Sequence, residues 1–297
     1  MLENKEKYNK PPLSISEQID LLKGRGLVVA DVGILEYYLK NISYYHLSIY
    51  FKHFQKDDIF YKDTSFEDVL RIYIFDNKLR FLLLELLERI EKSFKCRMAY
   101  ELSTAKNNPH WYLDEELFVN KEVHRENLKI INEECKKSRE ISIAHYNETY
   151  NEPALPPIWM LIEILSFGQC VKIGKSLKRE YKNKIARTFN EDEKFVMSWM
   201  HCLSVLRNNC AHYSRLWNRD FTLTPKALHK NFGGYFVLEN KRLFNYLVVL
   251  QILLGKINPT SSWLVKFKEL IDEHKIDVNQ MGFPEDWENR LNQIIPK

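Results

Sequence analysis

The chain has 297 residues, of which 45% are hydrophobic, 28% charged and 13% aromatic, a composition typical of a folded globular protein and not of a disordered one. The 44 basic and 40 acidic residues give a net charge of only +4, which is too small by itself to establish a polyanionic partner. The five cysteines form no Cys-x-x-Cys pair, which argues for reduced thiols and against a disulfide framework. Residues 1–7 contain no apolar signal segment, and the most apolar run, 246–254, is about half of the roughly 20 residues that cross a bilayer. We therefore expect a soluble, cytoplasmic protein.

Residues 1–62 are expected to form an N-terminal helical extension. Ser14 or Ser16 can cap a short helix that two glycines end, and residues 31–39 and 44–54 follow as two further short helices. The last of these is rich in aromatic side chains and histidines. Such side chains could stack on unpaired bases, but packing in a core is the favoured interpretation.

One long helix is expected over residues 66–106, because apolar residues recur there at helical spacing. Its other face is basic. Such a face is usually solvated and laced with i,i+4 ion pairs, but beside an active centre it could face RNA, and Arg89 and Lys92 are then its candidate contacts. Glu88 and Glu91 are candidates to support an arginine of a helix packed against this one.

The middle of the chain predicts two more helices, over 113–139 and 141–150, followed by a proline-rich linker over 151–157. This linker is expected to join two halves of one helical domain. Residues 168–176 then contain Gly-x5-Gly-Lys-Ser. A phosphate-binding loop has four residues in that gap and follows a strand, whereas a helical pattern precedes this stretch, so nucleotide hydrolysis is excluded.

A basic cluster occupies residues 172–187. It could follow the phosphates of a nucleic acid, and plain solubility explains it equally well. Its candidate RNA contacts are Lys172, Lys175, Lys178 and Arg179.

The most informative stretch is 206–219, Leu-Arg-Asn-Asn-Cys-Ala-His-Tyr-Ser-Arg-Leu-Trp-Asn-Arg. Apolar residues at helical spacing precede it, so it lies late on an amphipathic helix expected over 191–214. Its Arg207, Asn208 and His212 suit the cleavage of a phosphodiester. Histidine can take or return a proton near neutral pH, arginine fits phosphate oxygens in two contacts, and asparagine can orient either group. RNA brings its own nucleophile, the 2′-OH, so no metal is required.

The spacing of this motif raises a geometric difficulty. Arg207 and His212 diverge by about 140° on a regular helix, so either the helix distorts or a second copy of the motif completes the site. Arg215 and Arg219 follow the motif as candidate RNA contacts. The cysteines and histidines nearby lack the spacing of zinc ligands, and Cys210 faces a different side of the helix from His212.

Residues 207–212 resemble the R-x4-6-H motif of HEPN-domain ribonucleases, and the longer stretch 206–219 resembles the abortive-infection (Abi) D/F-type branch of that superfamily. Asn77 stands where this pattern leads us to expect an arginine. Further stretches resemble the same branch in the same order, namely 11–22, 75–91 and 157–168.

The resemblance implies an all-α fold, a HEPN-type helical bundle with additional N-terminal and C-terminal helices. We expect its core over 63–225, with the C-terminal helices of 226–297 packed on it. Within that last part the pattern predicts a small hairpin over 235–240. Three helices are expected to follow, over 241–257, 262–274 and 284–294.

The resemblance also implies a function: a metal-independent endoribonuclease toxin of an abortive-infection or toxin–antitoxin system that defends against phage. His212 is then the general base or acid, Arg207 the phosphate clamp and Asn208 the positioning residue, with no metal or cofactor. The products carry 2′,3′-cyclic phosphate and 5′-OH ends. A homodimer and restraint by a small non-coding RNA are implied too. The alternatives are a non-catalytic RNA-binding or scaffold protein and a pure protein-interaction module.

Overall fold

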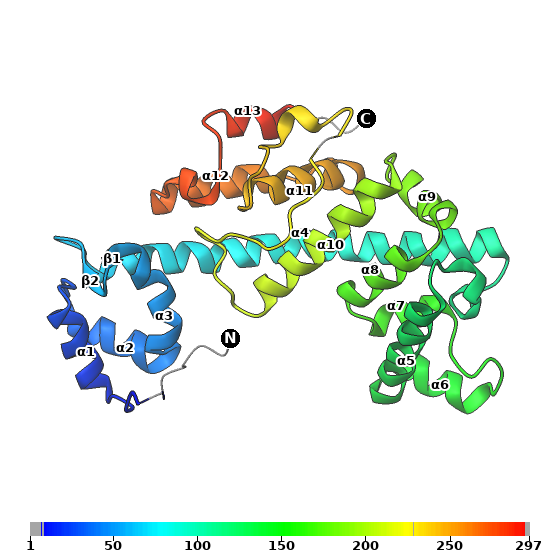
Figure 1. The fold of residues 1–297 in the computed structure, drawn as a ribbon, viewed down its shortest axis with the longest axis horizontal. Helices are drawn as coiled ribbons and strands as arrows, with labels where there is room; N and C mark the ends of the chain where they lie inside the picture. Colours follow the sequence, from blue (N-terminus) through cyan, green and yellow to red (C-terminus); the bar gives the residue numbers. More distant parts are fainter. Residues whose placement is uncertain (1–6, 8, 228, 295–297) are drawn as a thin grey trace. The chain divides into compact units, whose positions relative to one another are not determined.

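The computed structural model describes residues 7, 9–227 and 229–294. Within this part of the chain thirteen α-helices form, and the strands are two pieces of two residues each, so the predicted all-α fold is confirmed (Figure 1). The chain divides into two compact units, Met1–Lys78 with Asp272–Ile276, and Leu79–Ile271 with Asp277–Lys297. Residues 1–6 and 8, which include most of the segment searched for a signal, lie outside the described residues. No helix in the described ranges is both long enough and apolar enough to cross a membrane.

The first unit contains three short helices, a tight antiparallel strand pair and the start of the long helix α4. Of the two serines predicted as caps of the first helix, Ser14 is the N-cap, and it forms a capping box with Glu17. The aromatic segment contributes in part to the core: Tyr50 and Phe51 are buried, whereas Tyr45 is exposed. The Tyr50 hydroxyl donates a hydrogen bond of 2.8 Å to buried Asp76. The elements are α1 (Ile15–Gly24), α2 (Val32–Ile42), α3 (Tyr44–Phe51), β1 (Gln55–Lys56), β2 (Ile59–Phe60) and α4 (Phe66–Lys106).

The second unit contains the rest of α4 and the helices that follow it. Short 3₁₀ turns lie between several of them, and two such turns occupy the start of the helix predicted over 113–139, which begins only at Lys121. The helices are α5 (Lys121–Lys137), α6 (Ile141–Thr149), α7 (Ile158–Ile164), α8 (Phe167–Ser176), α9 (Arg179–Arg187), α10 (Glu193–Ala211), α11 (Phe244–Ile257), α12 (Trp263–His274) and α13 (Trp287–Asn292).

Helix α10 is the core of this unit. Ten of its residues are buried, which is the pattern of a helix covered on most sides, and α8 and α9 pack along it. Helix α8 also approaches α4 closely. A Cβ added to Gly174 would lie 3.3 Å from the ring of Phe94, so only glycine fits this contact without displacing the ring.

The hairpin predicted over 235–240 is wrong. Gly233–Tyr235 is a 3₁₀ turn, and the residues after it form no strand. The side-chain amide of Asn245 explains this. Its Oδ1 accepts from the Val237 N–H at 2.9 Å and its Nδ2 donates to the Val237 carbonyl at 2.8 Å. The backbone groups that a strand ladder would pair are thereby satisfied by a side chain.

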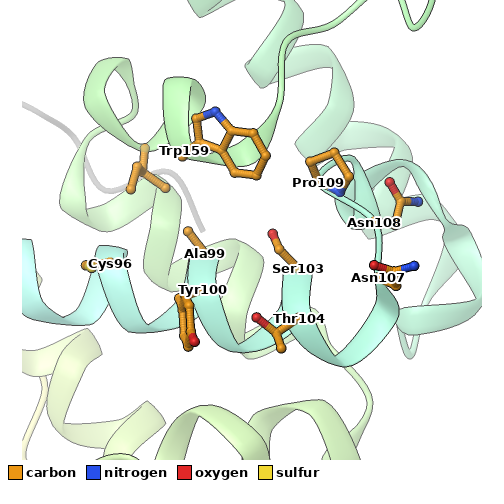
Figure 2. A pocket seen from close by; sticks show the side chains of 10 residues that line it. Cys96, Ala99, Tyr100, Ser103, Thr104, Asn107, Asn108, Pro109 and Trp159 are labelled. Carbon is orange, nitrogen blue, oxygen red and sulfur yellow. The ribbon is translucent and has the colours of Figure 1, made fainter.

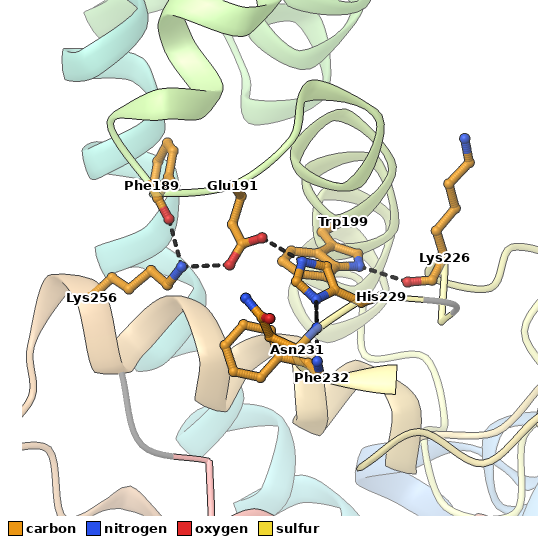
Figure 3. A network of polar contacts seen from close by, with 8 residues as sticks. All are labelled: Phe189, Glu191, Trp199, Lys226, His229, Asn231, Phe232 and Lys256. Atoms are coloured by element: carbon orange, nitrogen blue, oxygen red, sulfur yellow. Dashed lines mark hydrogen bonds and ion pairs between the residues drawn. The ribbon is translucent and has the colours of Figure 1, made fainter. Parts of the chain in front are cut away.

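A buried charge cluster fixes the turn that leads into α10 (Figure 3). Glu191 is 3% exposed at its side chain, and its two oxygens lie 2.5 Å from Lys256 Nζ and from His229 Nε2. The backbone N–H groups of Asn231 and Phe232 donate to His229 Nδ1. Because Nδ1 accepts, the ring proton sits on Nε2 and is donated to Glu191. The cluster therefore ties α11 and the segment around His229 to the start of α10.

Candidate functional site

The helix that carries the motif ends at Ala211, three residues earlier than predicted, and His212 is its C-cap. The backbone N–H of Ser214 donates to the Asn209 carbonyl at 2.9 Å, and that of Tyr213 to the Cys210 carbonyl at 3.3 Å. This pattern is a Schellman motif, which requires a left-handed residue directly after the cap. Tyr213 takes that conformation with φ of 57°. The chain turns away immediately after His212, whose imidazole is left exposed and has no hydrogen-bond partner within the described part of the chain.

Arg207 is held from the long helix α4. Its Nε lies 3.5 Å from Oε2 of Glu91, whose other oxygen lies 2.7 Å from Lys95 Nζ. The Lys95 ammonium also donates to the Leu165 carbonyl at 2.7 Å. Glu91 and Lys95 are each 13% exposed at the side chain and Arg207 is 38% exposed. The arginine is thus anchored through Nε while its fork reaches solvent, which is a suitable state for binding a phosphate.

Of the two glutamates expected to support the arginine, only Glu91 contacts it. Glu88 pairs instead with Lys92 at 2.6 Å, and both of these side chains are mostly exposed. The hydrogen bond and charge of Lys92 lower the pKa of Glu88 below its ordinary value.

Asn208 lines a cavity of about 520 Å³ between α5, α8 and α10. Its side-chain oxygen lies 3.5 Å from Arg207 Nη1, a separation too long for a firm hydrogen bond. Lys172 and Lys175, both predicted to contact RNA, line the same cavity from α8. Residues Gly168 to Ser176, for which the sequence argued against a phosphate-binding loop, are helical.

The remaining predicted cations are spread over several elements and partly neutralised. Arg89 lies 3.4 Å from Glu85, and Lys178 lies 3.6 Å from Glu116. Arg179 is 82% exposed, with its Nε 3.7 Å from Glu193. Each of these three cations therefore has a carboxylate within 4 Å.

The two arginines after the motif brace the turn rather than extend from it. Arg215 donates from Nη2 to the Asn218 carbonyl at 3.2 Å, and Arg219 donates from Nη1 to the Arg215 carbonyl at 3.3 Å. Between them Trp217 is buried. Arg219 also lies over the ring of Phe221, 5.7 Å from its centroid. Both arginines therefore stabilise the local conformation of the segment that follows His212.

The cysteines near the motif are buried. Cys210 is 2% exposed while His212 is exposed, so the two do not form a nucleophilic pair. Burial raises the pKa of the Cys202 thiol to about 12, which keeps it protonated. Among the described residues no group of three or more His, Cys, Asp or Glu side chains is placed to hold a metal ion.

A second cavity, of about 590 Å³, lies between the last turns of α4 and α7 (Figure 2). Tyr100, Ser103 and Trp159 are among the residues that line it, and the residues of α10 that the structure describes are not. This cavity is mostly apolar and brings together none of the groups that the motif chemistry needs.

His201, a residue of the cavity between α5, α8 and α10, was not predicted from the sequence. It lines the same cavity as Asn208, and its Nδ1 lies 3.0 Å from Lys175 Nζ. Burial and the charge of Lys175 lower the pKa of this imidazole. The signal was present in the sequence as a spacing of four and three residues from His201 through Val205 to Asn208, which places these three on one helix face.

A family profile described as Abi-like protein matches residues 37–218. This match covers more than half of the chain, so the chain belongs to the Abi-like protein family, and the resemblance to Abi proteins is confirmed. The matched range includes Arg207, Asn208 and His212. No curated protein and no solved structure matches the chain significantly. Membership of this family implies a role in abortive-infection defence.

Proposed function

We propose that the protein is a HEPN-type endoribonuclease toxin whose active site is built from Arg207, Asn208 and His212. The observation that carries this proposal is the state of the motif at the end of α10. An exposed imidazole and an arginine anchored by Glu91 flank an asparagine that lines a cavity. We assign this activity to a core of residues 63–225, with 1–62 and 226–297 as helical additions.

The chemistry is an internal transfer within the RNA strand. His212 removes the proton of a 2′-OH, and the 2′-oxygen attacks the adjacent phosphorus while the bond to the 5′-oxygen breaks. Arg207 stabilises the charge that develops on the phosphate oxygens. A protonated imidazole returns a proton to the leaving 5′-oxygen. The products carry a 2′,3′-cyclic phosphate and a 5′-OH, and the RNA supplies the nucleophile, so the step needs no metal.

The active species in this proposal is a homodimer with the two motifs facing across a two-fold axis. Its support is geometric, since side chains five positions apart on a helix diverge by about 140°, while two-fold symmetry brings one copy's motif to the other's. Mixing inactive Arg207→Ala and His212→Ala proteins tests this arrangement. Recovered activity in heterodimers supports a site shared between chains. A protein that is fully active and monomeric by light scattering at assay concentration contradicts it.

The direct test of the activity is cleavage of RNA by purified protein. Arg207→Ala and His212→Ala should each lower the rate by roughly 10²–10⁴, and EDTA should leave it unchanged. Undiminished cleavage by His212→Ala, or its abolition by EDTA, contradicts the mechanism. If the wild type binds RNA without cleaving it, the protein is instead a non-catalytic RNA-binding or scaffold protein. If the wild type shows no salt-dependent RNA binding at all, it is a protein-interaction module.

We also propose, from the family resemblance alone, that a small non-coding RNA restrains the toxin in the cell. Sequencing the RNA that copurifies with His212→Ala protein tests this point. One dominant small RNA is the expected result, and a mixture that mirrors total cellular RNA contradicts it.

A further inference from the structure

The cavity beside the motif has the size and lining of a small-ligand site. Its volume of about 520 Å³ falls within the range of about 300–1,000 Å³ that such sites occupy. Val123 of α5, Val171 of α8 and Val205 of α10 give it apolar walls. Lys175, His201 and Asn208 bring polar groups to the same space. Apolar walls beside a cation and groups that can form hydrogen bonds suit a nucleotide, whose base has two apolar faces and a polar edge and whose phosphate is an anion.

The contact between Lys175 and His201 prepares both groups to bind. An ammonium can only donate hydrogen bonds, so His201 Nδ1 must accept the contact at 3.0 Å. In the neutral ring the proton then lies on Nε2, which can donate to an acceptor of the ligand. Lys175 uses one of its three protons on the imidazole, and the other two remain for an anion.

The helix face connects this cavity with the motif. His201, Val205 and Asn208 follow one another at helical spacing on α10, and His212 is the C-cap four residues after Asn208. From His201 to Asn208 the helix rises about 10 Å. Asn208 therefore belongs both to the cavity and to the proposed catalytic motif.

We infer that this cavity binds one nucleotide of an RNA strand next to the phosphate that is cleaved. The base lies against the valines, where Asn208 and His201 can bond to its edge, and Lys175 binds its phosphate. This inference rests on the proposed ribonuclease function for the position of the nucleotide. It assigns to His201 a part in substrate recognition, in addition to the three motif residues.

The test measures binding in a protein that cannot cleave. In a His212→Ala background, the Kd for a fluorescent RNA oligonucleotide is determined by anisotropy, and that for adenosine and cytidine 3′-monophosphates by calorimetry. Val205→Trp fills the cavity and should weaken binding of the oligonucleotide and of the nucleotides at least 10-fold. Val265→Trp is the matched control, because Val265 is 59% exposed on α12, and it should change neither Kd.

A second variant guards against a misfolded Val205→Trp protein. His201→Leu keeps the cavity open and removes only the imidazole, so in the otherwise wild-type enzyme it should raise KM more than it lowers kcat. It should also change the preference for the base beside the cut, which a purely structural role would not do. If neither the Kd nor the base preference changes in these two cavity variants, the assignment is overturned.

The outcomes separate this inference from the proposed function. If wild-type protein cleaves RNA and neither cavity variant changes binding or base preference, the nucleotide site is wrong and the ribonuclease proposal stands. If wild-type protein does not cleave but Val205→Trp still weakens RNA binding 10-fold, the cavity is an RNA site and the catalytic proposal fails. If the His212→Ala protein with an unaltered cavity binds the oligonucleotide but neither mononucleotide, a single-nucleotide pocket is excluded.

Discussion

Neutralising Glu91 should impair the function of Arg207 without removing the arginine itself. In the Glu91→Gln variant the carboxylate that holds Arg207 Nε at 3.5 Å and Lys95 Nζ at 2.7 Å becomes an amide of nearly the same shape. The arginine then loses its anchor on α4, and its fork samples orientations that do not bind the phosphate. Misplacement of a catalytic group by about 1 Å can cost up to about 10²-fold in rate, so we expect kcat to fall by about 10- to 100-fold.

The cost in stability follows from the two contacts of Glu91. Unit charges 3.5 Å apart attract by about 5 kcal/mol at an effective dielectric constant of 20. Desolvation and the 38% exposure of Arg207 reduce the net contribution of that pair to about 1 kcal/mol. The hydrogen bond with Lys95 is better shielded and contributes about 1.5–3 kcal/mol, part of which the amide oxygen retains. We expect a loss of about 2–3 kcal/mol in the free energy of unfolding and a Tm lower by roughly 5–10 °C.

Two comparisons make this prediction refutable. Glu88→Gln removes an equivalent carboxylate one turn away that pairs only with exposed Lys92, so it should leave both rate and Tm nearly unchanged. The double variant Glu91→Gln/Arg207→Ala should be no slower than Arg207→Ala alone, because the glutamate acts through the arginine. Equal effects of Glu88→Gln and Glu91→Gln on kcat, or additive losses in the double variant, would refute the positioning role.

Three further predictions concern stability. Tyr213→Gly should be more stable than Tyr213→Ala by about 1 kcal/mol in urea unfolding, because alanine keeps the Cβ that disfavours a φ of 57°; equal stability would contradict the cap geometry. Glu191→Ala should lower the free energy of unfolding by about 3–5 kcal/mol, since it leaves the buried Lys256 ammonium unpaired, and a loss below about 1 kcal/mol would contradict this. Burial lowers the pKa of His201 and of His274 below 6.5; the unfolded chain therefore binds these protons first, and stability should fall as the pH drops from about 7 to 5. A Tm that rises over that interval would show that the neutral rings are not favoured by folding.

Long periodic segments were the predictable part of the fold. The helix predicted over 66–106 forms at the predicted residues. Its apolar residues recur at helical spacing over many turns, so the pattern is unambiguous. Positions decided by side chains distant in the sequence were not predictable. The extended segment after Tyr235 looked like a hairpin strand, and nothing local indicates that Asn245, eight residues beyond Val237, bonds to its backbone.

The candidate site divides in the same way. The chemistry of Arg207, Asn208 and His212 was evident from residue type and spacing, but the end of their helix was not. In a Schellman motif the left-handed residue is usually a glycine, which marks the helix end in the sequence. Here that residue is Tyr213, so the predicted helix ends three residues too late. Which glutamate contacts Arg207 depends on which face of α4 meets α10. Glu88 and Glu91 are three residues apart and lie on the same charged side of the helix, so the sequence does not distinguish between them.

The chemistry of the RNA ends made in living cells tests the central claim most directly. Wild-type protein and His212→Ala are expressed briefly at equal levels, and RNA ends are sequenced by a method that captures 2′,3′-cyclic phosphates and 5′-OH groups separately. New ends of both kinds at matching positions in wild-type cells, absent from His212→Ala cells, are the predicted result. The same ends in His212→Ala cells, or wild-type ends that carry 3′-OH and 5′-phosphate, would contradict a metal-independent cleavage by this motif.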